Sequence, residues 1–252
     1  MRRIIVEYEK CDGCKNCSAA CMQAHRKTPG TIYDLDLTDP ENESRNYILK
    51  GGILMILWTI QPKSTLDIIK EKGVFTCDTN KSEWYNSSNE FHRAYDWLVK
   101  EMDNKGIYHP KGLQLPLWAW HTIEYKHQKP DYYEMGFGEE GDELVCIEFE
   151  IPDNEVLLSD FDNWSLILNN DFVTKCNNEK EWEEEQQWLD NLPEDERKAA
   201  IINSWQRVFN LEAVNNDIRI AGSYIQATFW QLKKEMIRKV EYFTLTKHYH
   251  IF

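Results

Sequence analysis

The chain has 252 residues, and its 43 acidic and 29 basic residues give a formal net charge of −14. This length suffices for a sizeable hydrophobic core, while the acidity argues against non-specific nucleic-acid binding, which needs basic side chains to displace counterions. The longest apolar run, Ile53 to Trp58, is far shorter than the roughly 18 residues that a membrane span requires. We therefore expect neither a membrane nor a nucleic acid as a partner.

Cysteines near the N-terminus form the most specific motif. They lie at Cys11, Cys14, Cys17 and Cys21. Bacterial ferredoxins use this spacing to wrap a [4Fe–4S] cluster, with the fourth cysteine serving a second cluster. No second cysteine group follows, because the remaining cysteines are scattered, at Cys77, Cys146 and Cys176. Three thiolates could still hold a cluster if another ligand completed the fourth iron; a zinc site or unliganded thiols are the alternatives.

The segments around these cysteines extend the pattern. They are Arg2-Arg3-Ile4-Ile5-Val6 before the motif, and Ile32-Tyr33-Asp34-Leu35-Asp36-Leu37 and Glu43-Ser44-Arg45-Asn46 after it. With them, residues 1–48 resemble the ferredoxin-type iron–sulfur proteins that accompany carbon monoxide dehydrogenase. The resemblance implies that Cys11, Cys14 and Cys17 ligate a [4Fe–4S] cluster, that Cys21 serves another, and that this segment passes electrons to a redox partner. The chain departs from the family pattern at Met22, where a proline is usual.

Charge separates this segment from the rest of the chain. Residues 1–54 hold eight basic and eight acidic residues, so residues 55–252 hold 21 basic and 35 acidic residues and carry the whole net charge. We therefore expect a partial ferredoxin-type segment at 1–48, a junction at 49–54 and an acidic domain at 55–252. Codons for Lys50-Gly51-Gly52 can form a purine-rich ribosome-binding sequence, which favours Met55 as the start of the acidic domain; a flexible Gly-Gly linker is the alternative.

The first residues also bear on location. Met1-Arg2-Arg3 is basic, but only three apolar residues follow, which is too few for a signal peptide. Scattered, unpaired cysteines suit a reducing compartment. We expect a cytoplasmic protein.

The acidic domain begins with alternating strand and helix signals. Residues 55–62 predict a buried strand ended by Pro62, followed by a short helix capped by Gly73 and a strand at 74–77. Ser87 and Glu90 form a capping-box pattern before a helix whose apolar residues recur at helical spacing, namely Phe91, Tyr95, Leu98 and Met102.

Further strands are predicted at 117–123, 144–151 and 155–158, and the last of these leads into a helix around Trp164. Residues 179–211 predict two charged helices separated by Pro193, with Trp182 on the apolar face of the first and Trp205 on that of the second. Two late strands, 223–232 and 236–245, are expected to pair. Strands and helices that do not alternate regularly indicate an α+β domain with a single mixed sheet.

Five segments carry a family resemblance. They are Leu57-Trp58-Thr59-Ile60-Gln61-Pro62, Pro116-Leu117-Trp118-Ala119-Trp120-His121, Glu148-Phe149-Glu150-Ile151-Pro152, Val156-Leu157-Leu158-Ser159-Asp160 and Ile225-Gln226-Ala227-Thr228-Phe229-Trp230. On these segments the acidic domain is identified as a member of a bacterial family catalogued as a domain of unknown function (family 3841). The resemblance implies no particular activity.

Candidate catalytic residues are few, since the chain has no phosphate-binding loop, dinucleotide fingerprint, His-Glu-x-x-His motif or nucleophile elbow. Glu148 and Glu150 share one strand face and could act as an acid–base pair, or form a solvated face. His121 could be a base in an aromatic pocket, or a core histidine. Two further pairs are candidates. Asp160 and Asp162 could bind a cation or cap a helix, and His248 and His250 have the spacing of a chelating pair, in a terminal segment that is expected to be mobile.

The order of these segments suggests a function. Three predicted strands are similar in layout to those of ADP-ribosyltransferase-like folds. They are a first strand ending in Thr59-Ile60-Gln61, an aromatic strand containing Trp118 and Trp120, and a late strand beginning near Gln226. The resemblance implies a nicotinamide nucleotide in an aromatic cleft, with Gln226 where an acidic residue is usual. A concave pocket between Thr59, Trp120 and Gln226 would favour this function. The alternative is a non-catalytic interaction protein whose ten tryptophans form the core and partner contacts.

Overall fold

The computed structural model describes residues 53–82, 85–86, 88–132 and 138–245. The N-terminal cysteine motif, its proposed cluster, and His248 and His250 lie outside these residues. The described residues of 55–151 and 155–245 belong to one compact unit, which contains the elements described below apart from residues 54 and 152–154. No helix in the described ranges is both long and apolar enough to cross a membrane.

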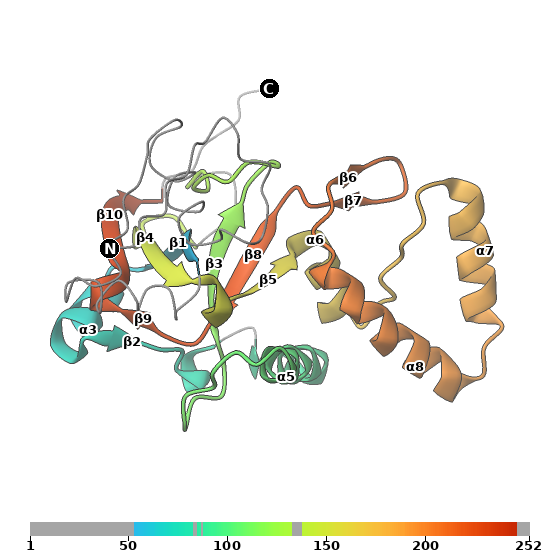
Figure 1. Cartoon of the computed structure of the whole chain (residues 1–252), viewed down its shortest axis with the longest axis horizontal. Helices are drawn as coiled ribbons and strands as arrows, with labels where there is room; N and C mark the ends of the chain where they lie inside the picture. The colour runs from blue at the N-terminus through green and yellow to red at the C-terminus, as the bar shows by residue number, and fades with distance from the viewer. Residues whose placement is uncertain (1–52, 83–84, 87, 133–137, 246–252) are drawn as a thin grey trace, which may run out of the picture. The chain divides into compact units, whose positions relative to one another are not determined.

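A six-stranded sheet is the centre of this unit (Figure 1). Its spatial order is β10 (Ile237–Thr244), β4 (Glu143–Pro152), β1 (Leu54–Pro62), β3 (Leu117–Thr122), β8 (Ile225–Phe229) and β5 (Leu157–Asp160). Strand β3 pairs antiparallel with β1 and β8, while β5 pairs antiparallel with β8 and β10 with β4. Two small sheets join β2 (Val74–Phe75) to β9 (Leu232–Lys233) and β6 (Val214–Asn215) to β7 (Ile220–Ala221).

Five α-helices are present in the described ranges. They are α3 (Ser64–Lys72), α5 (Asn89–Asn104), α6 (Phe161–Leu168), α7 (Glu179–Asp190) and α8 (Glu194–Ser204). Helices α7 and α8 lie to one side of the sheet, beyond β5 (Figure 1). Short 3₁₀ helices are η3 (Thr79–Lys81), η4 (Asp153–Glu155), η5 (Trp205–Phe209) and η6 (Lys234–Met236). Strands and helices in this arrangement confirm the predicted α+β class.

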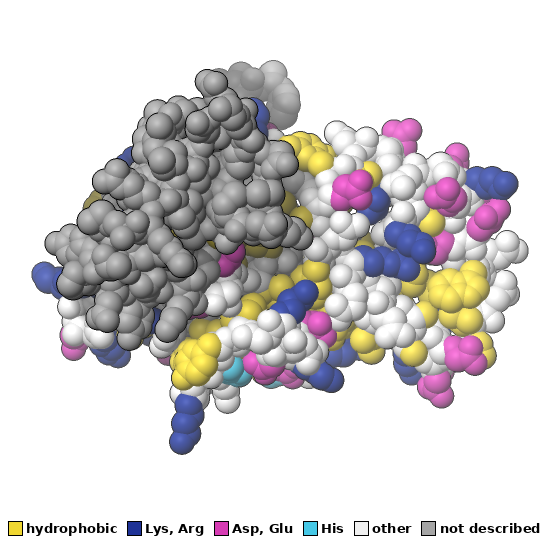
Figure 2. Space-filling model, viewed as in Figure 1, with side chains coloured by type: hydrophobic (Ala, Val, Ile, Leu, Met, Phe, Trp, Pro, Cys, Tyr) yellow, Lys and Arg dark blue, Asp and Glu magenta, His cyan; other side chains and the backbone are white. Residues whose placement is uncertain are grey.

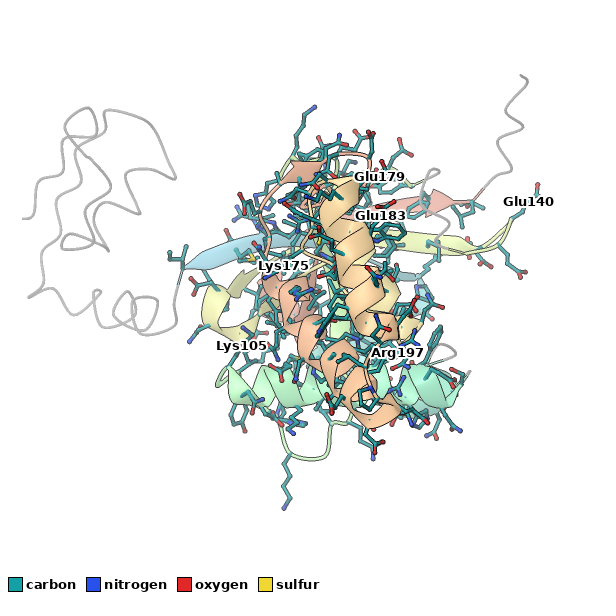
Figure 3. All side chains as sticks on the ribbon, turned by 90° about the vertical axis from the view of Figure 1, so that its right-hand side faces the viewer. Lys105, Glu140, Lys175, Glu179, Glu183 and Arg197 are labelled. Carbon is teal, nitrogen blue, oxygen red and sulfur yellow. The ribbon has the colours of Figure 1, made fainter. Side chains whose placement is uncertain are left out.

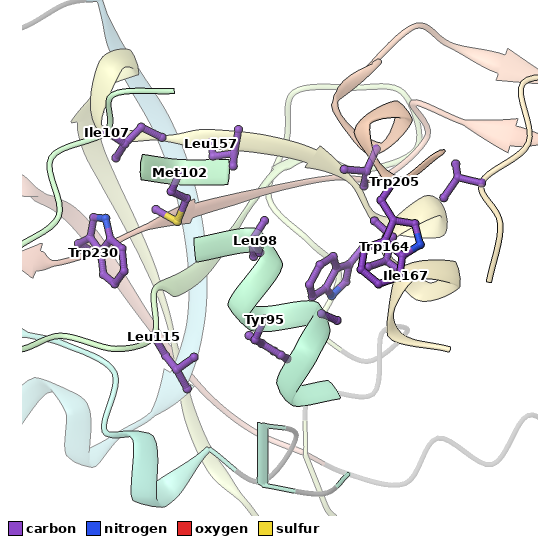
Figure 4. Packing of buried hydrophobic residues seen from close by; sticks show 13 residues of the cluster. Tyr95, Leu98, Met102, Ile107, Leu115, Leu157, Trp164, Ile167, Trp205 and Trp230 are labelled. Carbon is purple, nitrogen blue, oxygen red and sulfur yellow. The ribbon is translucent and has the colours of Figure 1, made fainter. Parts of the chain in front are cut away.

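Two hydrophobic cores cover the two faces of the sheet. Because side chains alternate along a strand, Ala119 and Ala227 belong to one core, whereas Trp118 packs against the other. The second core includes Leu98 and Met102 of α5, both fully buried, together with residues of α6 and η5 (Figure 4). The helical spacing that predicted the inner face of α5 is therefore confirmed at these two positions.

Helix ends agree with the predictions within about one turn. Gly73 ends α3 in the left-handed conformation, with φ 76°, and its N–H donates to Ile69 O. Pro62 is the last residue of β1, which confirms the predicted end of this strand, and α3 begins at Ser64. Helix α5 is capped by Ser88, whose Oγ accepts from Phe91 N at 3.2 Å, so the predicted cap at Ser87 is wrong by one residue.

Three predictions about the second half are wrong. Trp182 is 41% exposed and does not face the core. Trp205 is buried but lies in η5, because α8 ends at Ser204. The two late strands do not pair, since β8 lies between β3 and β5 while β10 pairs with β4 near the other edge of the sheet.

Candidate functional site

A row of side chains crosses one face of the sheet where the motif strands meet. Trp58 of β1 is opposite Trp120 of β3, and Trp120 is opposite Gln226 of β8. Directly paired residues point to the same face, so these three side chains lie side by side. Thr59 follows Trp58 in β1 and points to the opposite face. Thr59, Trp120 and Gln226 therefore do not enclose a common pocket, although their three strands are neighbours.

The row ends in polar atoms without partners. Gln226 is opposite Ser159 of β5. Ser159 is fully buried, and neither its Oγ nor the buried Oε1 of Gln226 has a hydrogen-bond partner within the described ranges. Buried polar atoms are usually satisfied, which makes this pair a place where an additional polar group would be stabilised.

Glu148 and Glu150 of β4 have different partners. Glu148 Oε2 accepts a hydrogen bond from Trp58 Nε1 at 3.0 Å. Glu150 forms an ion pair with Arg238 of the neighbouring strand β10. The two carboxylates share a strand face as predicted, and each has a structural partner of its own.

His121 is half-buried in a histidine pair on β3 and the following turn. Its ring stacks on His127 with centroids 4.5 Å apart, and its Nδ1 lies 2.8 Å from Thr122 Oγ1. Burial, with a smaller contribution from His127, lowers the pKa of His121 from 6.5 to about 4. His121 is therefore neutral at pH 7, and such a low pKa weakens it as a general base.

Asp160 and Asp162 are explained by the start of α6. Asp160 is fully buried, and its carboxylate accepts from Asn163 N at 2.8 Å and from Gly222 N at 2.6 Å. Asp162 accepts from Ser223 Oγ at 3.2 Å. Burial raises the pKa of both carboxyl groups. Asp160 is thus the helix cap that the sequence allowed, and no group of three or more metal-ligating side chains occurs in the described part of the chain.

A pocket of about 870 Å³ lies at the end of β1, close to the start of β3. Its walls come from four segments: Gln61 and Pro62, one side of α3, residues 74–82, and the approach to β3 that ends at Trp118. This volume is in the range of small-molecule sites. Sequence reasoning singled out Gln61 and Trp118 but missed the residues of α3 and of the 74–82 segment, which carry no recognisable motif.

Hydrogen bonds hold the motif residues of this pocket in place. Gln61 Nε2 donates to Thr59 Oγ1 at 2.9 Å, and Thr59 Oγ1 donates to Trp118 O at 2.8 Å. The Trp118 ring also packs on Tyr95 and Trp164, with centroids 6.0 and 5.2 Å apart. Trp118 Nε1 is buried without a partner among the described residues. The wall is thus rigid, and it retains one unused donor.

The pocket combines apolar surface with cations. Ile68, Phe75 and Trp118 supply apolar walls, and Lys72 and Lys81 both line the pocket. The remaining candidate nucleophile is Cys77, whose pKa is raised by burial and by neighbouring Asp78. A neutral thiol is a poor nucleophile at pH 7, so this arrangement favours binding over covalent chemistry.

Comparison with known proteins places the chain in a family. A family model described as "Domain of unknown function (DUF3841)" matches residues 56–238. The chain belongs to the DUF3841 family. The DUF3841 match spans β1 to the start of β10, so it contains the whole pocket and the row from Trp58 to Gln226. Neither a curated protein nor a solved structure matches the chain.

Proposed function

We propose that the DUF3841 domain of this chain binds a nucleotide in the pocket at the end of β1. The observation that carries the proposal is the composition of that pocket, where the aromatic side chains of Phe75 and Trp118 share one space of about 870 Å³ with Lys72 and Lys81. An apolar wall suits a base or nicotinamide ring, and lysine ammonium groups suit phosphates.

The sheet order supports the same reading. Strands β1, β3 and β8 are adjacent, as in the layout of ADP-ribosyltransferase-like folds that the sequence suggests. Gln226 occupies the late strand where those families usually carry an acidic residue. A neutral amide cannot act as a base, and we therefore propose binding without ADP-ribosyl transfer.

Calorimetry on the full chain tests the proposal, with NAD⁺, ADP-ribose and ATP as separate probes. We expect saturable binding of at least one probe, weakened about tenfold by Lys72→Ala if the ammonium contacts a phosphate. Lys70→Ala is the matched control, because Lys70 lies in the same last turn of α3 but is not part of the pocket wall. Absence of binding for all three probes, or equal effects of the two variants, contradicts the proposal and favours a non-catalytic interaction protein.

For residues 1–48 we propose a separate function, the binding of an iron–sulfur cluster by Cys11, Cys14 and Cys17. In this proposal Cys21 serves a second cluster, and a redox partner accepts the electrons. The cysteine spacing supports it. Anaerobic reconstitution of the full chain should give iron and sulfide in cluster stoichiometry together with visible absorbance, and Cys14→Ser should abolish both. Free cysteines elsewhere in the chain, Cys77, Cys146 and Cys176, are consistent with a cytoplasmic location.

A further inference from the structure

Helices α7 and α8 form a hairpin with a groove of its own. The groove has a volume of about 410 Å³ and lies between Trp188 of α7, Leu192, Phe172 and one side of α8. We call it the hairpin groove, and its α8 side is formed by Glu196, Ala199 and Ala200. Figure 2 shows hydrophobic side chains exposed in this region, bordered by charged side chains.

Small side chains at helical spacing explain the hollow. Residues three and four apart lie on one face of a helix, so Glu196, Ala199, Ala200 and Asn203 form a stripe along α8. The two alanines leave space that a larger residue would fill. Opposite them, Trp188 is 49% exposed, although indole rings usually bury most of their surface.

The floor of the groove is fixed. Phe172 contacts Trp188 edge to face, with ring centroids 6.2 Å apart. The Arg207 guanidinium lies over the Phe172 ring at 4.9 Å, and it forms an ion pair with Glu185 at 3.5 Å. The apolar surface is therefore presented by a rigid frame, and binding there would not first require ordering of these side chains.

The hairpin carries excess negative charge. Residues 179–207 contain nine acidic and four basic residues. Each basic residue already has a carboxylate partner, in the pairs Lys180–Glu184, Arg197–Asp190, Lys198–Glu194 and Arg207–Glu185. Five carboxylates form no ion pair within the described part of the chain: Glu179, Glu181, Glu183, Asp195 and Glu196. Figure 3 looks onto α7 and labels Glu179 and Glu183 along it.

We infer that the hairpin groove docks a basic segment of another protein, in which one large apolar side chain is flanked by lysines or arginines. The apolar side chain would enter the groove and pack on Trp188, while the flanking cations would meet the unpaired carboxylates. Exposed tryptophans in a partly desolvated groove are frequent anchor points of interfaces, and complementary charges add specificity and speed of association. A second copy of this chain fits less well, because its own net charge is −14.

Fluorescence anisotropy of labelled synthetic peptides on the full chain tests this inference. The probe is a lysine- and arginine-rich peptide with a central leucine or tryptophan, and the comparison peptides replace either the anchor with glycine or the cations with glutamate. We expect saturable binding of the probe, at least about tenfold weaker binding of both comparison peptides, and weakening by added salt.

Variants of the hairpin locate the site. Trp188→Ala should weaken the probe about tenfold, whereas Trp182→Ala, which alters another exposed tryptophan of α7 outside the groove, should not. Glu196→Lys changes an exposed residue of the groove wall and should weaken binding without affecting the fold. Three results would each overturn the inference. The Trp188 and Trp182 variants could bind the probe equally, or the anchor-free peptide could bind as tightly as the probe. The third result is a dimer in sedimentation that Trp188→Ala abolishes.

Discussion

Trp205 is the side chain whose removal should destabilise the domain most clearly. It is 1% exposed in the core beneath α5 and α6, and its Nε1 donates to Asp171 O at 3.0 Å. Trp97 packs against its ring at a centroid distance of 5.4 Å. Trp205→Ala removes the largest fully buried side chain among the described residues and leaves a cavity, for which we expect a loss of about 4 kcal/mol in the free energy of unfolding.

A second substitution separates packing from hydrogen bonding. Trp205→Phe keeps an aromatic ring but leaves Asp171 O without its donor, so we expect a loss of about 1 to 2 kcal/mol. Urea denaturation at pH 7 measures both variants. Trp182→Ala is the control, because that ring is 41% exposed and should change the stability by less than about 0.5 kcal/mol. If Trp205→Ala costs no more than Trp182→Ala, the assignment of Trp205 to the core is wrong.

Three further predictions concern charge and backbone. Lys129, Lys239 and Tyr132 lower the pKa of Glu241 from 4.5 to about 2, so ionised Glu241 stabilises the fold above pH 4.5 and this stabilisation is lost as the pH falls towards 2. In urea titrations, Glu241→Gln should therefore lower the free energy of unfolding by about 1 kcal/mol at pH 7 and by less at pH 3. Burial lowers the pKa of His121 from 6.5 to about 4, so between these pH values the imidazole is protonated more readily in the unfolded chain, and the folded state loses stability as the pH falls. His121→Asn should therefore make the melting temperature depend less on pH between pH 7 and about pH 4.5. Gly222 has φ 73°, and an added Cβ would lie 2.9 Å from Ala213 Cα, so Gly222→Ala should lower the free energy of unfolding by more than about 1 kcal/mol. The loss should exceed that of the control Gly141→Ala, where φ is 93° but no atom lies within 4 Å of the added Cβ.

Local patterns predicted the elements whose environment follows from their own sequence. Val145, Ile147 and Phe149 of strand β4 are fully buried as the alternation indicated, and Glu148 and Glu150 between them are partly exposed, although Cys146 on the glutamate face is buried as well. The cap of α5 was wrong by one residue because Ser87 and Ser88 are adjacent and chemically identical. Only the geometry of the turn decides which hydroxyl reaches Phe91 N.

Non-local choices were harder to predict. The helical spacing of Trp182 indicated a core position only on the assumption that α7 packs against the sheet. Helix α7 instead packs against α8, and its acidic residues other than Glu185 remain exposed. Similarly, 223–232 and 236–245 looked like a hairpin because they are consecutive, yet β8 and β10 are separated in the sheet by β4, β1 and β3.

The candidate site depends on the same kind of information. Whether Trp58 or Thr59 shares a face with Trp120 depends on the register of β1 against β3, and a shift of one residue would exchange them. The sequence of either strand does not contain that register. The pocket adds a further requirement, since Gln61 and Trp118 lie on different strands and reach it at the strand ends, where α3 and the 74–82 segment complete the wall. A motif can therefore identify the strands that form this site, but the ligand class that we propose depends on two cations that the fold brings to them, Lys72 and Lys81.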